Sequence, residues 1–211
     1  MKDIIIIGLG GFAKEIIWLA EECNRNVIGL LCESVDDVST EFFGKPVLGI
    51  QSTWTDYPDC EFIVGVGSPA IRKLIVSELE EQGKPDYATL IHPSVKMSST
   101  VSVGTGTMIC AGCILTVDIS IGQHCIFNLN STVGHEVVIE DYVTVAPIVA
   151  MSGNVTIESL VEIGTGAMIR QGLTMHKGSM LGMGGVLTKN MPKYKLYAGN
   201  PAKLLKDMSP E

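Results

Sequence analysis

The stretch IGQHCI FNLNST VGHEVV IEDYVT VAPIVA MSGNVT, residues 121–156, decides the fold of this chain. Each group of six begins with an apolar residue, and the same series runs without insertion from Ile91 to Leu187. The position four residues later is mostly small or β-branched. A period of six fits neither the 3.6 residues of a helical turn nor the alternation of a flat strand. It predicts a triangular parallel β-solenoid with one short strand and one corner per hexapeptide and three hexapeptides per coil.

Composition excludes several classes of protein. The 211 residues carry a net charge of −8, which argues against a protein that binds nucleic acid. No apolar run is long enough to span a membrane, and the first residues do not read as a signal peptide, so we expect no membrane partner and a cytoplasmic location. Aromatic residues are only 6% of the chain, which suits a narrow core filled by aliphatic side chains.

The six cysteines are expected to be reduced thiols, because no secretory signal is present. Cys110 and Cys113 have the spacing of half a zinc site, but no second pair matches them, so we expect no metal. Cys113 and Cys125 fall in the small-residue phase of the repeat, which predicts small core residues.

The first ninety residues follow a different pattern. Residues 3–8, 27–32 and 61–66 read as buried strands, and residues 12–23 have helical spacing. Ser68 followed by Pro69 is a good helix start, and the helix should run to about Gln82. Alternating strands and helices predict a small Rossmann-like parallel α/β domain over residues 1–90, followed by the β-helix over 91–187. Residues 188–211 should form a closing segment, because the end of a solenoid exposes strand edges.

The glycine-rich turn of Gly8, Gly10 and Gly11 lies between a strand and a helix. Backbone N–H groups in that position can approach a diphosphate at the helix N-terminus. Glu33 follows the second strand, with two further acids close behind, and could meet a ribose or a base. A tight turn with surface acids is the alternative interpretation, and both stay open on these residues alone.

His135 is the histidine of most interest. It occupies the third position of its hexapeptide, so its side chain should project outward, and Glu136 follows it directly. A general base is one interpretation and a solvated surface histidine is the other. Neighbours on a strand point to opposite faces, so a direct bond between these two side chains needs the geometry of a corner. His124 and His176 have no acidic neighbour in the chain and are predicted to be surface residues, and His92 is predicted to be structural.

Residues 171–206 contain six lysines and no Asp or Glu. Such a run is either a solvated tail or a local cationic site for a phosphorylated ligand on an otherwise acidic protein.

Five segments together resemble one family from end to end. They are the glycine turn Gly8-Leu-Gly-Gly-Phe-Ala-Lys-Glu15, the segment Val64-Gly-Val-Gly-Ser-Pro-Ala-Ile-Arg72, then Ile91-His-Pro-Ser94, Gly134-His-Glu136 and Ala198-Gly-Asn-Pro-Ala-Lys203. The chain resembles the bacterial sugar O- and N-acetyltransferases of the left-handed β-helix superfamily, of the sialic acid acetyltransferase and UDP-amino-sugar N-acetyltransferase type. The hexapeptides alone indicate only the superfamily, whereas the five segments together indicate this branch.

The resemblance implies a homotrimer that binds acetyl-CoA in the groove between adjacent β-helices. It implies that His135 is the general base, that Glu136 orients it and that Asn128 lies nearby. The residues implied to contact the coenzyme are Thr144, Gly153, Thr165, Met183, Gly199, Pro201 and Lys203. Those implied to hold a nucleotide sugar are Gly8, Gly10, Gly11, Phe12, Glu33, Gly67 and Arg72.

The expected activity is transfer of an acetyl group from acetyl-CoA to the amine of a nucleotide-linked amino sugar, in surface-glycan synthesis. O-acetylation of sialic acid or a related sugar is the alternative, and a non-catalytic scaffold is a third. Three positions depart from the family pattern. Thr144 and Phe12 stand where relatives often have histidine, and Cys32 stands where they tend to have Asp. These departures concern the identity of the sugar and its nucleotide more than the acyl transfer.

Overall fold

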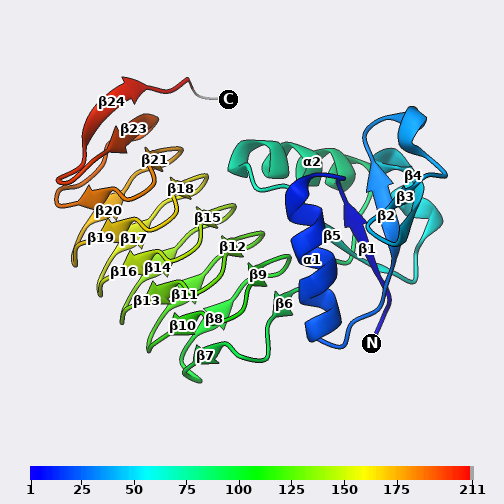
Figure 1. The fold of residues 1–211 in the computed structure, drawn as a ribbon, viewed down its shortest axis with the longest axis horizontal. Helices are drawn as coiled ribbons and strands as arrows, with labels where there is room; N and C mark the ends of the chain where they lie inside the picture. Colours follow the sequence, from blue (N-terminus) through cyan, green and yellow to red (C-terminus); the bar gives the residue numbers. More distant parts are fainter. Residues whose placement is uncertain (210–211) are drawn as a thin grey trace. The chain divides into compact units, whose positions relative to one another are not determined.

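The computed structural model describes residues 1–209 and divides the chain into two compact units, with the boundary between Leu90 and Ile91. Each unit has its own regular architecture (Figure 1). Within residues 1–209, no helix combines the length and the apolar character needed to cross a membrane.

The first unit is a small α/β domain around one sheet, as the sequence predicts. Its sheet has the order β3-β4-β2-β1-β5. The strands are β1 (Ile4–Ile7), β2 (Val27–Cys32), β3 (Glu41–Phe42), β4 (Lys45–Ile50) and β5 (Glu61–Val64). The helices are α1 (Gly11–Glu22) and α2 (Pro69–Gln82), with short 3₁₀ turns at Val35–Asp37 and Gln51–Asp56. The four isoleucines of β1 are fully or almost fully buried and form the centre of the domain.

Two strands of this sheet were not predicted. β4 pairs in parallel with β2, and β3 forms an antiparallel hairpin with β4. Pro46 and Gly49 lie inside β4, and both residue types disfavour a strand reading of the sequence. Proline is tolerated at this end of β4 because the parallel pairing with β2 begins only at Val47, so no ladder bond to β2 needs the N–H that Pro46 lacks. Ser68 stands at the N-cap of α2 as predicted, but its side chain makes no capping hydrogen bond.

The second unit is the predicted β-helix, a three-sided prism of two-residue strands. Strands pair with those 18 residues away, for example Ile114 with Thr132, so each coil contains three hexapeptides. The first face contains β7 (Lys96–Met97), β10 (Ile114–Leu115), β13 (Thr132–Val133), β16 (Ala150–Met151), β19 (Met168–Ile169) and β22 (Val186–Leu187). The second contains β8 (Ser102–Val103), β11 (Ser120–Ile121), β14 (Val138–Ile139), β17 (Thr156–Ile157) and β20 (Thr174–Met175).

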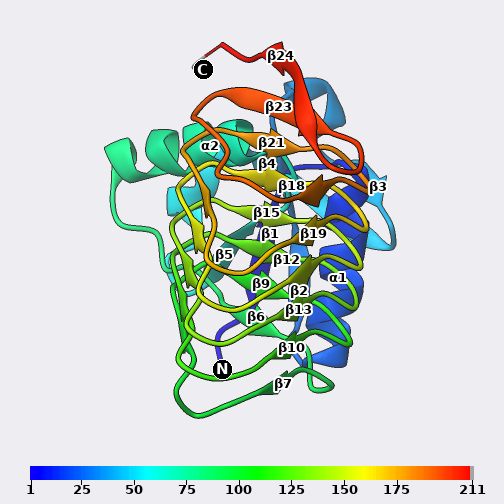
Figure 2. The same ribbon diagram turned by 90° about the vertical axis from the view of Figure 1, so that its left-hand side faces the viewer.

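The third face is the longest and includes the closing segment. It contains β6 (Leu90–Ile91), β9 (Met108–Ile109), β12 (Ile126–Phe127), β15 (Thr144–Val145), β18 (Glu162–Ile163), β21 (Met180–Leu181), β23 (Lys195–Ala198) and β24 (Lys203–Asp207). β23 adds to β21 in parallel, and β24 turns back antiparallel on β23. Figure 2 shows the coils stacked one above another and ending in these two strands.

The interior of the prism is filled by the two predicted phases. From Ile109 to Leu187 the first residue of every hexapeptide is buried. Cys113 and Cys125 are fully buried among them, as expected for small core residues, and burial raises the pKa of the Cys113 thiol. Met97 is an exception, with 43% of its surface exposed, because it lies in the terminal strand of the first face.

Three corners connect the faces, and we name each by one residue. The His135 corner, between the first and second faces, includes residues 116–119, 134–137, 152–155 and 170–173. The His124 corner, between the second and third faces, includes 104–107, 122–125, 140–143, 158–161 and 176–179. The Thr165 corner, between the third and first faces, includes 110–113, 128–131, 146–149, 164–167 and 182–185.

The corners share one backbone feature that the apolar pattern does not reveal. Every sixth residue from Gly106 to Gly184 has a positive φ, the left-handed conformation that lets the chain turn sharply. Glycine takes this position in several coils, but His124, Glu136 and Tyr142 also adopt it. The strict repetition of the turn keeps equivalent residues of successive coils in register at each corner.

Candidate active site

His135 and Glu136 form a hydrogen-bonded pair on the outer surface of the His135 corner. The Nδ1 atom of His135 is 2.9 Å from Oε2 of Glu136. The two side chains are 61% and 66% exposed, so the imidazole projects outward as its hexapeptide position predicts. A carboxylate only accepts hydrogen bonds, so the pairing assigns the proton to Nδ1 and leaves the lone pair on Nε2. The arrangement leaves the Nε2 lone pair of an exposed side chain available to a ligand.

The corner is what allows two consecutive residues to pair. Glu136 has φ +57°, the left-handed turn conformation, so its side chain does not point away from His135 as it would on a strand. Neighbouring coils fix the backbone on both sides: Glu136 donates its N–H to the carbonyl of Val117, and Asn154 donates to the carbonyl of His135. The corner geometry that the sequence left undecided is therefore present.

Gly153 lies on the next coil beside this pair. Its carbonyl accepts a hydrogen bond from Gly172. Its own N–H has no acceptor among residues 1–209. Gly153 is one of the residues predicted to contact the coenzyme, and its backbone has a free donor next to the imidazole.

Asn128 does not accompany His135. It lies on the Thr165 corner, and its Oδ1 accepts the N–H of Leu129 at 2.7 Å. The whole first face, including the strand Thr132–Val133, separates the two corners within one chain. Within one chain, therefore, Asn128 and His135 lie at opposite edges of the first face. A spacing of seven residues covers just over one hexapeptide, and therefore one full side of the triangle.

Most of the other predicted coenzyme residues lie with Asn128 and not with His135. Thr165 and Met183 occupy equivalent positions on the Thr165 corner, where Met183 is 76% exposed. Gly199 extends the same corner by one coil, with its carbonyl bound to the N–H of Val186, and Pro201 and Lys203 follow. Thr144 belongs to neither corner, because it starts β15 on the third face. The predicted coenzyme set is thus divided between two corners.

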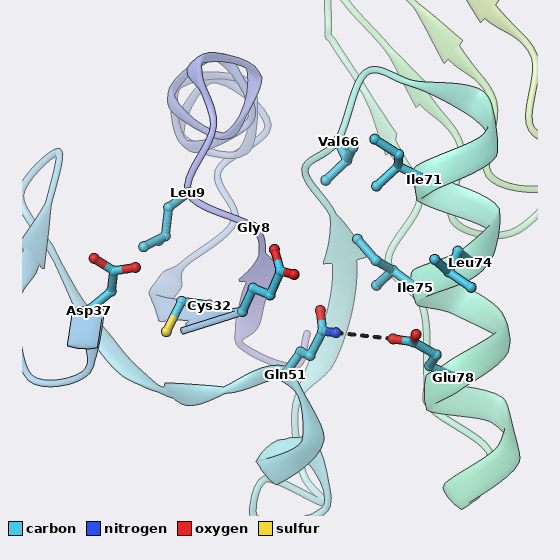
Figure 3. A pocket seen from close by; sticks show the side chains of 11 residues that line it. Gly8, Leu9, Cys32, Asp37, Gln51, Val66, Ile71, Leu74, Ile75 and Glu78 are labelled. Carbon is cyan, nitrogen blue, oxygen red and sulfur yellow. Dashed lines mark hydrogen bonds between the residues drawn. The ribbon is translucent and has the colours of Figure 1, made fainter. Parts of the chain in front are cut away.

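The first unit contains a cavity of about 340 Å³ beside the glycine turn (Figure 3). Its lining residues are Gly8, Leu9, Cys32, Glu33, Asp37, Gln51, Val66, Ile71, Leu74, Ile75 and Glu78. The apolar side chains come largely from one side of α2, and Gln51 donates to Glu78 at 3.1 Å across the cavity. None of these lining residues is a lysine or an arginine.

Only two of the seven predicted sugar-nucleotide residues, Gly8 and Glu33, line this cavity. Sequence reasoning missed its α2 side, formed by Ile71, Leu74, Ile75 and Glu78. These positions are spaced i, i+3, i+4 and i+7, which places them on one helical face, and that spacing was the available signal. Gly8 needs to be glycine, because its φ is +110°.

The other predicted nucleotide residues lie around the start of the two helices. Gly10 is the N-cap of α1 and makes no side-chain capping bond, so the N–H groups of Gly11 and Phe12 in the first turn remain available to a ligand. Arg72 is different, because it is completely buried and donates from Nη1 to the carbonyls of Val66 and Gly67. The buried guanidinium of Arg72 therefore binds the loop before α2, to which Gly67 contributes one of the accepting carbonyls.

Of the two histidines predicted to be surface residues, His176 is one, with 43% of its side chain exposed, whereas His124 is not. His124 is 2% exposed and stacks on Tyr142 of the next coil, with ring centroids 5.3 Å apart. His176 is 2.7 Å from Oε1 of Glu158, which lies 18 residues earlier. Partial burial opposes ionisation of Glu158, but hydrogen bonds from the N–H of Lys177 and from His176 outweigh it and lower the pKa of the carboxyl. Coil stacking creates both contacts, so chain neighbours could not reveal them.

Within the described part of the chain, no group of three His, Cys, Asp or Glu residues is placed to hold a metal ion. Cys113 donates its S–H to the carbonyl of Asn128 at 3.2 Å inside the prism, away from the exposed pair. The His135–Glu136 pair itself is suited to proton transfer, because a carboxylate holds its imidazole.

Comparison with known proteins gives consistent relatives. Residues 3–79 match the family model of the PglD N-terminal domain. UDP-N-acetylbacillosamine N-acetyltransferase of Bacillus subtilis (strain 168) is 32% identical over 117 residues, 53% of this chain and 52% of that protein. The alignment thus spans about half the length of that curated relative.

Solved structures match over the whole chain. A variant of perosamine N-acetyltransferase from Caulobacter crescentus, in complex with CoA and GDP-perosamine, is 26% identical, covers 98% of each chain and has a TM-score of 0.89. WeeI from Acinetobacter baumannii AYE is 30% identical, covers 97% of this chain and 100% of its own, and has a TM-score of 0.85.

The hexapeptide prism and its match to solved acetyltransferases define the fold class as that of the left-handed β-helix acyltransferases. The α/β domain that precedes the prism in the sequence matches the PglD N-terminal domain, and this match restricts the class to β-helix acyltransferases that carry such a domain. The chain belongs to the sugar N-acetyltransferases of this superfamily.

Proposed function

We propose that this protein transfers the acetyl group of acetyl-CoA to the amine of a nucleotide-linked amino sugar, a step of surface-glycan synthesis. The observation that carries the proposal is the exposed His135–Glu136 pair on a corner of an acyltransferase fold, which leaves Nε2 of the imidazole able to accept a proton. The relatives that bind CoA and an amino-sugar nucleotide support the choice of substrates. The reaction belongs in the cytoplasm, where acetyl-CoA and nucleotide sugars are available.

The His135–Glu136 pair would move one proton during the acetyl transfer. The neutral amine nitrogen attacks the acetyl carbonyl carbon, and His135 Nε2 takes a proton from that nitrogen as the C–N bond forms. The C–S bond then breaks, the thiolate of CoA leaves, and the imidazolium returns the proton to sulfur. Glu136 keeps the proton on Nδ1 and stabilises the imidazolium that forms in between. The products are an amide and CoA with a free thiol.

The cavity of the first unit suits the nucleoside part of the sugar nucleotide. Glu33, Asp37 and Glu78 offer carboxylate oxygens that accept hydrogen bonds from ribose hydroxyls and base N–H groups. The aliphatic residues of α2 provide an apolar wall for a planar base. With no cation in the lining, the diphosphate belongs outside this cavity, at the uncapped first turn of α1.

A homotrimer explains why the predicted coenzyme residues lie on two corners. The first face separates the His135 corner from the Thr165 corner within one chain. A neighbouring copy docked along this face brings its own Thr165 corner, with Thr165, Met183 and Lys203, beside the first copy's His135. Acetyl-CoA then lies between the two copies, and the lysines of residues 171–206 attract its phosphates. The outward residues of the first face support docking, because Ile114 and Met168 are 42% and 55% exposed.

Met168→Asp tests this assembly. The charge would be buried at every contact of the proposed trimer without a partner, so we expect a monomer and an activity lowered at least about tenfold. The control is Val138→Asp, at an apolar position on the second face that is 45% exposed, which should remain trimeric and active. Light scattering after size exclusion measures both masses. An active wild-type monomer would contradict the arrangement.

The function itself is tested by thiol release. Purified protein with acetyl-CoA should release CoA thiol in the presence of a GDP-, UDP- or dTDP-linked 4-amino sugar. The kcat/KM for the nucleotide-linked sugar should exceed the kcat/KM for free sialic acid by about 10²-fold or more, because the nucleotide contributes binding energy. Mass spectrometry should find an N-acetyl product. Release with sialic acid alone would favour O-acetylation. A scaffold that does not bind acetyl-CoA would not be stabilised by it. An enzyme that binds it gains about 2.7 kcal/mol in free energy of unfolding when acetyl-CoA is present at 100 times its Kd.

A further inference from the structure

The imidazole of His135 occupies the space where Gly153 has no side chain. A Cβ built on Gly153 would lie 2.5 Å from Cε1 and 2.8 Å from Cδ2 of His135, and closest of all to Nε2. Ordinary contacts of a Cβ atom begin at 3.4 Å. A residue with any side chain at position 153 would therefore exclude the ring from its present place.

The backbone of Gly153 gives no other reason for glycine. Its φ lies outside the left-handed region, unlike those of Gly166 and Gly172 in the coils nearby. A φ outside that region is open to L-residues. The requirement for glycine thus comes from the imidazole and not from the turn.

We propose that Gly153 is the positioning residue for the base. The missing side chain lets the Nε2 edge of the ring lie against the next coil at Gly153, while Glu136 holds the ring at Nδ1. The carboxylate fixes one nitrogen and the bare Cα beneath the other edge fixes the tilt, so together they set the direction of Nε2. The role of His135 as a base rests on the proposed function, whereas the placement of its ring by Gly153 does not.

The expected response to a side chain at Gly153 follows from what it would displace. The ring is the end of a mobile side chain that is 61% exposed, so it can rotate into solvent while the coils stay in place. The cost in stability is then small. The cost in rate is large, because a shift of about 1 Å in a reacting group lowers the rate by roughly 10²-fold.

Gly104 offers the opposite case and serves as the matched control. It is also a glycine with φ outside the left-handed region, but its Cβ would lie 2.5 Å from backbone atoms of Gly122. Backbone cannot rotate away, so Gly104→Ala should lower the melting temperature and leave kcat per folded molecule unchanged. Gly153→Ala should lower kcat and leave the melting temperature nearly unchanged.

The experiment measures kcat, both KM values and melting temperature for wild type, Gly153→Ala and Gly104→Ala. We expect kcat of Gly153→Ala to fall about 10²-fold, with both KM values within about threefold of wild type. Long-range ¹H–¹⁵N NMR of histidine-labelled apo protein gives a second readout, because displacement of the ring removes the Glu136 hydrogen bond. We expect the His135 signal, assigned with a His135→Ala sample, to change from the Nδ1–H tautomer to a mixture.

A Gly153→Ala protein with wild-type kcat and an unchanged His135 tautomer would overturn the proposal. So would an equal loss of kcat in both variants, because that result would show a general effect of disturbing the coils. The NMR readout needs no substrate, so it tests the placement even if the wild type transfers no acetyl group. Failure of the proposed function would appear instead as an absence of thiol release by the wild type.

Discussion

His135→Ala is expected to lower kcat by about 10²–10⁴-fold, because the variant loses the group that removes the amine proton. The KM values for acetyl-CoA and for the sugar nucleotide should change little, since the proposed role of the imidazole concerns the transition state and not binding. The thiol-release assay at saturating substrate gives kcat directly. A mass in solution and a melting temperature equal to those of the wild type would show that the loss is chemical, because the side chain is 61% exposed and supports no packing in the core.

The chain contains its own control for this substitution. His176 also pairs through Nδ1 with a carboxylate, Glu158, but on the His124 corner. His176→Ala removes a similar imidazole–carboxylate pair and should keep wild-type kcat. A His135→Ala protein that works at the wild-type rate would remove the proposed base, and equal losses in both variants would indicate damage to the fold.

Phe127→Ala is expected to lower the free energy of unfolding by about 3–5 kcal/mol. Phe127 is fully buried inside the prism and lies in β12, between Ile109 and Val145 of the adjoining strands. Alanine leaves a cavity that neighbouring coils cannot close, because the backbone hydrogen bonds between strands keep the coils at a fixed spacing. Urea unfolding followed by circular dichroism measures the change.

Two further variants make that measurement specific. Phe43→Ala removes the same side chain from a position that is 59% exposed and should cost less than about 1 kcal/mol, including its contact with Lys14. Phe127→Leu keeps most of the volume and should fall between the two. A Phe127→Ala protein within about 1 kcal/mol of wild type would contradict the close packing of the interior.

The apolar pattern of the repeat was enough to predict the prism, its three hexapeptides per coil and its two inward phases. It could do so because each hexapeptide places its first residue toward the same interior, so the signal repeats and does not depend on distant parts of the chain. The α/β unit was harder to read. β4 was missed because Pro46 and Gly49 disfavour a strand locally, while pairing with β2 stabilises one.

For the candidate site too, features that follow from the repeat could be predicted, whereas contacts that depend on tertiary packing could not. The outward direction of His135 follows from its place in the hexapeptide, and the structure confirms it. The buried position of Arg72 could not be predicted, because the carbonyls that satisfy its guanidinium belong to a loop whose path depends on the packing of α2. The stacking of His124 on Tyr142 also needed the coils, since these residues are 18 apart in sequence.

The sequence by itself determined the repeating solenoid, the order of the two units and the presence of an outward histidine followed by an acid. Only the tertiary structure decided that a left-handed turn at Glu136 lets the two side chains bond, that Gly153 leaves room for the ring, and that Asn128 lies on a different corner. The physical reason is that a period of six is the same at every corner. It states which residues face inward, whereas contacts between side chains depend on how successive coils close and stack.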